Sequence, residues 1–233
     1  MDNDLNFETY LFISEKKFII YVNSETNDQL YKKELIHNQD SSKLNLDKLD
    51  HFLNENIFKI EKILNGFVKK IIMIVDTKDF FSVDISIKKN NYGNILSLKT
   101  LNYLLYDLKD YCKKSTHGSK IIHMIIQNYL INGKTHNFFP ENIKCSSFSL
   151  DVKFICLPNN LIKNIEMILK KYQISLKQSV NANYISKFLN NDDKNVFLMS
   201  KKLIEGYNRN EVLLVDKINK KQGFFEKFFN FFS

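Results

Sequence analysis

The sequence predicts a mixed α/β fold, on the basis of three observations. Apolar runs of strand length alternate with segments of helical period through most of the 233 residues. The segments 80–88 and 147–156 alternate apolar and polar residues, which is typical of strands that bury one face. The run Lys120–Gly133 is rich in Ile and stops at a turn pair, Asn132 and Gly133, which indicates a long buried strand.

The first 79 residues contain predicted strands around one helix. Strand formers occur at Tyr10–Ile13 and Phe18–Val22, on either side of the polar turn Ser14–Lys17, and again at Leu30–Ile36. An amphipathic helix and a buried strand are expected next, at Leu46–Leu64, with Gly66 just past its end, and at Val68–Val75.

The next segment, 80–157, predicts the order strand, helix, strand, strand. Its first strand, Phe80–Lys88, places four apolar residues on one face, and a turn follows at 90–94. The helix after the turn has a single apolar face, made of Leu98, Leu101, Leu104, Leu105, Leu108 and Cys112. The runs 120–133 and 147–156 supply the last two strands, with Phe138–Pro140 in the loop between them.

The last part of the chain gives weaker signals. Pro158–Asn160 predicts the start of a helix, with Pro in the first turn and Asn as the cap. Its apolar face contains Leu161, Ile165, Ile168 and Leu169. Four short elements follow: a strand at 177–180, a helix at 183–189, and strand candidates at Asn195–Met199 and Glu211–Val215.

The strongest motif is Ile122–Gly133. With His123, Gln127 and Tyr129 it resembles a family-specific strand of FtsA, the actin-like cell-division protein of bacteria. The similarity continues through Leu150–Cys156 and Lys163–Glu166. It covers roughly residues 8–190 and is strongest over 120–170. The type IV pilus protein PilM shares this module and is the nearest competing resemblance.

This resemblance implies a division of the chain into parts. Residues 1–79 would be a partial actin-like subdomain 1A, and 80–157 the inserted strand–helix–strand–strand subdomain, called SHS2 or 1C. Residues 158–200 would return to 1A, 201–222 would be a linker, and 223–233 an amphipathic membrane-targeting helix. The second half of the actin fold, with the ATP cleft and the subdomain that binds FtsZ, would be absent.

The first phosphate-binding turn of the actin-like family would lie at Ser14–Lys16. By the resemblance, Phe12 stands at its Asp position, Ser14 at its Gly and Glu15 at its Thr. A carboxylate repels phosphate, and without Gly the backbone cannot approach closely. We therefore expect no nucleotide, no other cofactor and no enzymatic activity.

The C-terminal tail predicts a membrane-binding helix. At 100° per residue, its six Phe fall within one arc of the helix surface. A ten-residue helix of roughly 15 Å is too short to cross a bilayer and would lie in the interface plane. The predicted membrane-binding residues are Phe224, Phe225, Lys227, Phe228, Phe229, Phe231 and Phe232. The alternative is a terminal helix docked on the protein's own core.

Composition excludes several other classes. The net charge of +8 would suit nucleic acid, but the basic residues are scattered, so we expect no nucleic-acid partner. Three cysteines without metal spacing indicate reduced, buried thiols. We expect no metal site, since the five histidines lack ligand spacing, and His123 in an apolar strand is expected to be a satisfied core residue. No apolar run is long enough to span a bilayer, and the N-terminus does not resemble a signal peptide.

The function expected from the sequence is that of a shortened, nucleotide-free FtsA-like adaptor in cell division. The resemblance implies that 1C binds the cytosolic tails of membrane division proteins, and it allows contact with FtsZ and self-association. The expected location is the cytoplasmic face of the inner membrane, at the division site. The alternative is a PilM-like pilus or secretion platform protein. An actin-like ATPase and a nucleic-acid binder are weaker hypotheses.

Overall fold

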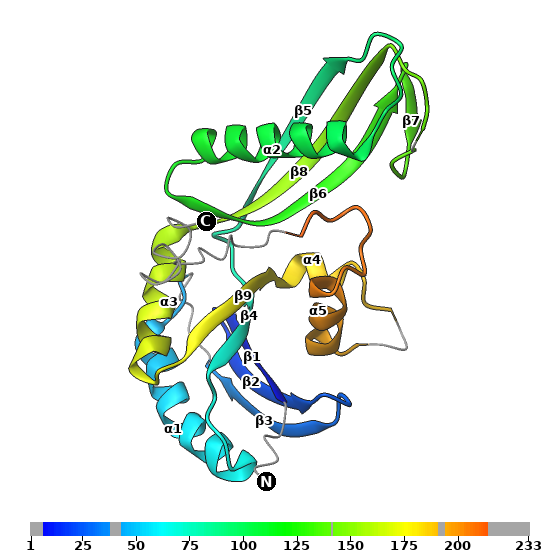
Figure 1. Ribbon diagram of the computed structural model, residues 1–233. Helices are drawn as coiled ribbons and strands as arrows, with labels where there is room; N and C mark the ends of the chain where they lie inside the picture. Colours follow the sequence, from blue (N-terminus) through cyan, green and yellow to red (C-terminus); the bar gives the residue numbers. More distant parts are fainter. Residues whose placement is uncertain (1–6, 38–42, 141, 191–193, 214–233) are drawn as a thin grey trace, which may run out of the picture.

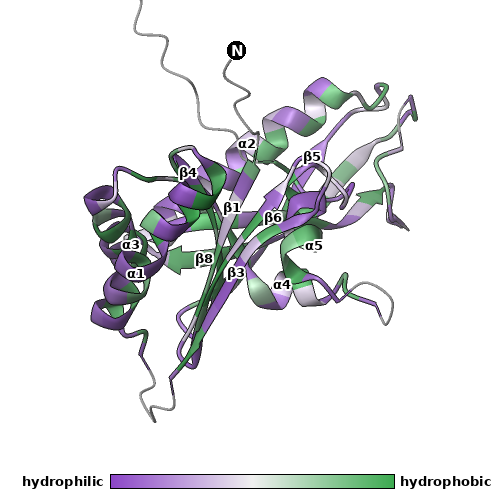
Figure 2. Cartoon of the chain, turned by 90° about the horizontal axis from the view of Figure 1, so that it is seen from below, coloured by the Kyte–Doolittle hydropathy of each residue, from purple (hydrophilic) through white to green (hydrophobic). Residues whose placement is uncertain are grey.

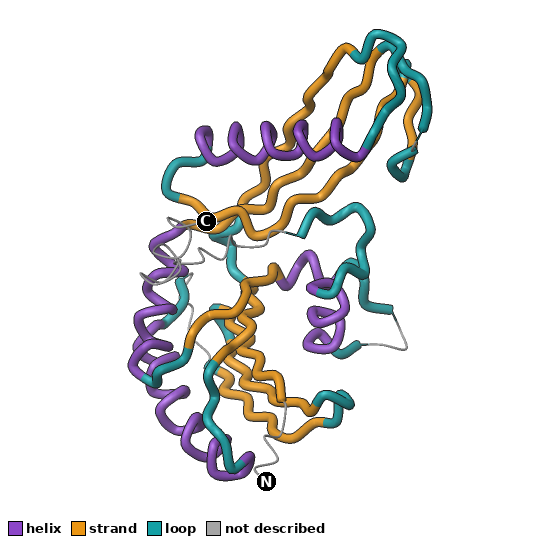
Figure 3. The backbone as a smooth tube through the Cα atoms, in the orientation of Figure 1, coloured by secondary structure: helices purple, strands orange, loops and turns teal. Residues whose placement is uncertain are grey.

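A computed structural model describes residues 7–37, 43–140, 142–190 and 194–213. In this part the chain forms two β-sheets, called here sheet A and sheet B, and five helices (Figure 1). The two sheets lie in separate parts of the molecule, with sheet B above sheet A in the view of Figure 3. The prediction of an α/β fold is therefore confirmed.

Sheet A has five strands in the order β3-β2-β1-β4-β9. The first three form an antiparallel meander, whereas β4 and β9 run parallel to β1. The strands are β1 (Phe7–Ser14), β2 (Lys17–Ser24), β3 (Gln29–Ile36), β4 (Lys70–Asp76) and β9 (Ser175–Asn181). Two parallel neighbouring strands must be joined by a long crossover connection. One such crossover therefore joins β1 to β4, and a second joins β4 to β9.

One face of sheet A is covered by α1 (Leu46–Leu64) and α3 (Asn159–Lys171). The apolar stripe of α1 includes Leu49, Phe52 and Ile60, all buried against the sheet. In Figure 2 the hydrophobic colour of both helices lies on the side that faces the strands. The Asn45 side chain caps α1 at its start, and Asn65, with φ 50°, takes the left-handed position at its end. The bounds predicted for α1, Leu46–Leu64, are confirmed.

The other face of sheet A is covered by α4 (Ala182–Ser186) and α5 (Val196–Ile204). The prediction of a strand at Asn195–Met199 is wrong, because this run starts helix α5. The Asn195 side chain accepts hydrogen bonds from the backbone N–H groups of Phe197 and Leu198, as an N-cap does. A short apolar run does not distinguish strand from helix, and here the cap decides the outcome.

Sheet B is inserted between β4 and α3, within the second crossover of sheet A. Its strand order is β5-β8-β6-β7, and α2 covers one face. The elements are β5 (Phe81–Asn90), α2 (Leu98–Ser115), β6 (Ser119–Ile131), β7 (Lys134–His136) and β8 (Ser147–Pro158). The predicted order strand, helix, strand, strand is present, with the three-residue β7 added.

The alternating strand β8 places Phe148, Leu150, Val152 and Phe154 in the core under α2, as its period predicts. All three cysteines are free and buried. Burial raises the pKa of Cys156 to about 12 and also raises that of Cys112, so these thiols stay protonated and inert. Their structural role agrees with the sequence prediction.

Three further expectations are corrected by the structure. Pro158, not an Asn, occupies the N-cap of α3, and no side chain caps that helix. Residues 201–204 belong to α5, so the stretch expected as a linker begins as helix. The strand candidate Glu211–Val215 is reduced to one bridge between Glu211 and Ile125, and residues 214 and 215 lie outside the described residues. Within the described ranges no helix is long and apolar enough to cross a membrane.

Candidate functional site

The turn between β1 and β2 contains Ser14, Glu15 and Lys16, the residues for which the resemblance predicts an altered phosphate-binding turn. The Ser14 hydroxyl accepts hydrogen bonds from the backbone N–H groups of Lys16 and Lys17, at 3.3 and 3.0 Å. Because this side chain engages both N–H groups, they are not free to bind a phosphate oxygen.

Carboxylates gather at the same edge of sheet A. Glu15 accepts a hydrogen bond from the Thr77 hydroxyl, and Asp79 lies within 3.3 Å of that hydroxyl. Burial, and then the nearby Glu15 carboxylate, raise the pKa of Asp76. This concentration of negative charge opposes a phosphate group.

His123 occupies the junction between the two sheets. Its Nε2 accepts a hydrogen bond from the backbone N–H of Asn181 at 3.0 Å, so the ring hydrogen is on Nδ1. Nδ1 then donates to the Glu211 carboxylate at 2.6 Å, and the Tyr184 hydroxyl donates to the other oxygen of that carboxylate at 2.7 Å. The side chains of His123 and Glu211 are only 3% and 8% exposed. His123 is therefore a satisfied buried residue, as predicted.

This network ties the end of the described chain to both sheets. The backbone of residues 210–212 pairs with β6, through Ile126 N–H to Asn210 C=O and Val212 N–H to Met124 C=O, both at 2.8 Å. Asn181 belongs to sheet A, whereas His123 belongs to sheet B. The sheets are thus held together by a buried polar contact as well as by apolar packing of Ile122, Leu157 and Ile162.

A cleft of about 600 Å³ opens beside this junction. Its walls are the end of α2, the start of β6, the middle of β9 and the segment 211–213. The basic and imidazole side chains in its lining are Lys109, Lys113, His117, Lys120 and Lys177. The acidic residue of the lining, Glu211, is turned inward to His123. The cleft therefore has a positive lining.

The lysines of the cleft differ in whether they already form an ion pair within the chain. Lys177 lies 3.1 Å from Glu8, which also contacts Lys201 at 3.5 Å. Burial alone would raise the pKa of Glu8, but Tyr10 and the two lysines hold that pKa below its usual value. Lys113 and Lys120 are exposed and form no ion pair with any described residue. These two side chains are the free cations of the cleft.

Strand β9 contributes a backbone edge to the cleft. It is the last strand of sheet A, so its side away from β4 has no strand partner in the described part of the chain. Residues 177–179 of this strand line the cleft. The hydroxyl of Ser179 is buried and has no hydrogen-bond partner among the described residues. An extended segment lying along β9 could pair with this edge and meet the lysines.

The sequence did not identify this site. Lysines 109, 113, 120 and 177 come from α2, β6 and β9, and the chain has many other lysines with the same local appearance. The residues predicted to bind membrane, Phe224, Phe225, Lys227, Phe228, Phe229, Phe231 and Phe232, lie outside the described residues.

The strand order, the helices on both faces of sheet A and the insertion in its second crossover define an actin-like α/β fold.

No protein-family model and no curated protein sequence matches the chain. Solved structures are similar at low level. One is the PilM–PilN type IV pilus biogenesis complex, with 7% sequence identity and a TM-score of 0.46 over 78% of this chain and 49% of that chain. Another is the cytoplasmic domain of EpsL, an inner membrane component of the type II secretion system of Vibrio cholerae, with 12% identity and a TM-score of 0.34 over 77% of this chain and 57% of that chain. A third is a Bacteroides thetaiotaomicron protein with an actin-like ATPase fold and unknown function, with 14% identity and a TM-score of 0.34 over 81% of this chain and 58% of that chain.

The chain spans about half to three-fifths of the length of these proteins. Since each of these three TM-scores is below 0.5, the assignment of the fold rests on the topology of the chain itself.

Proposed function

We propose that this chain is a non-enzymatic adaptor, which holds an extended, acidic segment of a partner protein in the cleft between its two sheets. The observation that carries the proposal is the combination of the free lysines Lys113 and Lys120 with the unpaired edge of β9. Backbone pairing along an edge strand gives affinity, and charged side chains beside it give specificity.

The absence of enzymatic activity is part of this proposal. The hydroxyl of Ser14 engages the N–H groups of its own turn, and Glu15, Asp76 and Asp79 make that edge of sheet A acidic. Titration calorimetry with ATP and magnesium is expected to give no heat of binding, and a micromolar affinity would contradict this.

Two cellular settings fit such an adaptor. In one, it is a pilus or secretion platform, in which the segment belongs to a membrane component of the apparatus. In the other, it is a division adaptor, in which the segment is the cytosolic tail of a division protein, and the Phe-rich tail binds the inner-membrane surface. The names of two similar structures agree with the platform setting, which we therefore test first.

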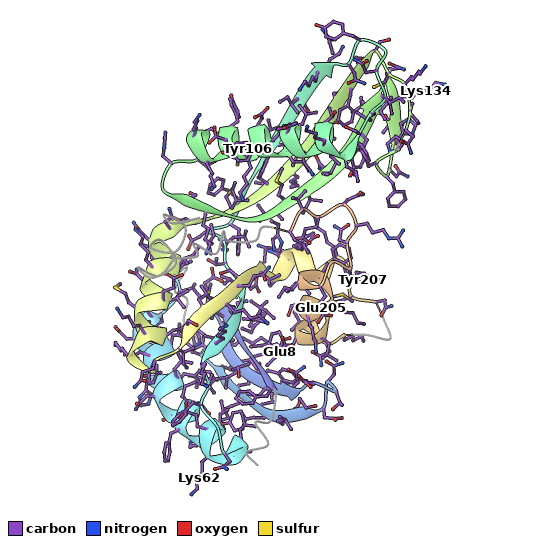
Figure 4. All side chains as sticks on the ribbon, viewed as in Figure 1. Glu8, Lys62, Tyr106, Lys134, Glu205 and Tyr207 are labelled. Atoms are coloured by element: carbon purple, nitrogen blue, oxygen red, sulfur yellow. The ribbon has the colours of Figure 1, made fainter. Side chains whose placement is uncertain are left out.

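The test uses peptides of the cytosolic tails of the membrane proteins encoded beside this gene. A fluorescent acidic tail should bind the wild-type protein, and the double change Lys113→Glu and Lys120→Glu should weaken binding by at least about tenfold. The matched control is Lys62→Glu, because Lys62 lies on α1 at the far end of the molecule from sheet B (Figure 4). Equal binding by all three proteins, or no binding by any tail, would reject the proposal.

The same experiment separates the two settings. If the tail that binds comes from a pilus or secretion operon, the platform is supported. If it comes from a cell-wall and division cluster, the division adaptor is supported.

A further inference from the structure

Strand β5 leaves a long backbone edge uncovered on sheet B. It pairs with β8 on one side over all ten residues without a register shift, and no described strand lies on its other side. Figure 1 shows β5 at the margin of the upper sheet. The opposite margin, β7, has three residues, and β5 contains no proline and no bulge. Proteins usually protect such an edge, because it can accept another strand.

The side chains of β5 alternate between two faces. Val83, Ile85 and Ile87 face α2 and are partly buried. The opposite face contains Ser82, Asp84, Ser86 and Lys88, which are exposed. Asp84 and Lys88 therefore lie on the same face, one on each side of Ser86 and at equal distance from it.

We propose that β5 is a self-association surface, on which a second copy of this chain adds its own β5 in antiparallel orientation, centred on Ser86. In this register each Asp84 lies opposite Lys88 of the second copy, and both such pairs form at once because the contact is two-fold symmetric. On the other face, Ile85 lies opposite Ile87 of the second copy. The two sheets join into one continuous sheet, with both α2 helices on the same side.

The charges select this register over its neighbours. A pairing centred on Asp84 would place the two Asp84 carboxylates opposite each other, and one centred on Lys88 would oppose the two lysines. Pairings centred on Ile85 or Ile87 place the charged side chains opposite serine or asparagine. The register centred on Ser86 joins both charged residues of the exposed face to an opposite charge, and directly opposed like charges are destabilising.

This surface lies on the outer margin of sheet B, whereas the cleft adjoins the end of α2 and β9. Self-association is therefore independent of the proposed peptide binding, and the two proposals can fail separately. A dimer formed in this way would carry two clefts.

Charge exchange tests the register. Asp84→Lys places lysine opposite lysine, and Lys88→Asp places aspartate opposite aspartate, so each single change should raise the dimer dissociation constant by at least about tenfold. The double variant with both changes restores opposite charges and should restore the dimer. The measurement is sedimentation equilibrium of the full chain over a range of concentrations, with Lys62→Glu as the control that leaves association unchanged.

A cysteine placed at the centre gives a second readout. The three native cysteines are buried, so Ser86→Cys provides the accessible thiol. Two such thiols would lie within about 5 Å in the proposed dimer, and a short bis-maleimide should cross-link them. In Ser82→Cys the two thiols would be roughly 27 Å apart, so that variant should not cross-link.

Three results would overturn the proposal: a wild-type chain that stays monomeric, a dimer unaffected by the single charge changes, or equal cross-linking at positions 82 and 86. Recovery of the dimer by the double variant supports it, because a merely destabilised fold would not recover.

Discussion

At the scale of single residues, His123 shows how one side chain can hold two sheets together. Its two ring nitrogens are both used, one by the backbone of Asn181 in sheet A and the other by Glu211. A buried carboxylate that loses its partner is costly, because water cannot replace the lost hydrogen bond.

The change His123→Ala should therefore lower the free energy of unfolding by about 3 kcal/mol, measured by urea denaturation. The matched control is His51→Ala. His51 contacts Glu55 on an exposed part of α1, and its loss should cost less than about 0.5 kcal/mol. Equal losses in the two variants would contradict the role assigned to the buried pair.

Asp50 gives a pH-dependent prediction. Hydrogen bonds from Lys171 and then Tyr172 hold the pKa of Asp50 below its usual value, and these contacts link α1 to α3. A depressed pKa means that the contribution to stability is present above the unfolded-state pKa and is lost as pH falls through the folded-state value.

We therefore expect Asp50→Asn to be less stable than the wild type at neutral pH, by up to about 1 kcal/mol because solvent screens the pair. The difference should shrink as the pH falls below about 4. Thermal melts at several pH values measure it. A constant difference at all pH values would show that the charge of Asp50 is not responsible.

At the scale of elements, α5 begins at a side-chain cap, whereas α3 begins without one. Asn195→Ala removes the side-chain acceptor at the start of α5 and should cost about 1 kcal/mol. Asn159→Ala, at the start of α3, should change stability little, because no side chain caps that helix. Chemical denaturation of both variants measures the free energy of unfolding. A larger loss of stability in Asn159→Ala than in Asn195→Ala would contradict the assignment of the side-chain cap to α5.

At the scale of the whole molecule, we propose that the Phe-rich tail predicted from the sequence to bind membrane determines where the protein is located. Each Phe of an interfacial helix could gain about 1.5–3 kcal/mol if fully buried, and each nearby Lys adds about 1 kcal/mol at an anionic surface. Changing Phe228 and Phe229 to Glu should abolish co-sedimentation with anionic vesicles and leave the melting temperature unchanged. High salt should weaken binding of the wild type only in part, since salt screens the lysines and not the apolar contacts.

If the tail instead docks on the protein's own core, both expected results, for vesicle binding and for melting temperature, are reversed. Vesicles would then bind little, and the same double change would lower the melting temperature by several degrees. The variant Lys62→Glu, with its change on α1, is the control for a general effect of charge.

The sequence by itself determined most of the elements. The helix at Leu46–Leu64 and the alternating strands of sheet B follow from periodicity and turn residues, which are local properties. The insertion of the segment 80–157 between β4 and α3 was expected only from the resemblance. The polar turn Ser14–Lys17 was also visible in the sequence, whereas its identification as an altered phosphate turn came only from the resemblance. Local patterns failed at Asn195–Met199, where a short apolar run fits both periods and packing with its cap selected the helix.

Only the tertiary structure decided which distant residues meet. His123 and Glu211 are 88 positions apart, and the lysines of the cleft come from one helix, α2, and two strands, β6 and β9. Strand order likewise decided that β9 and β5 lie at sheet edges. The physical reason is that pairing and packing between remote segments depend on the whole set of buried contacts, which no short stretch of sequence contains.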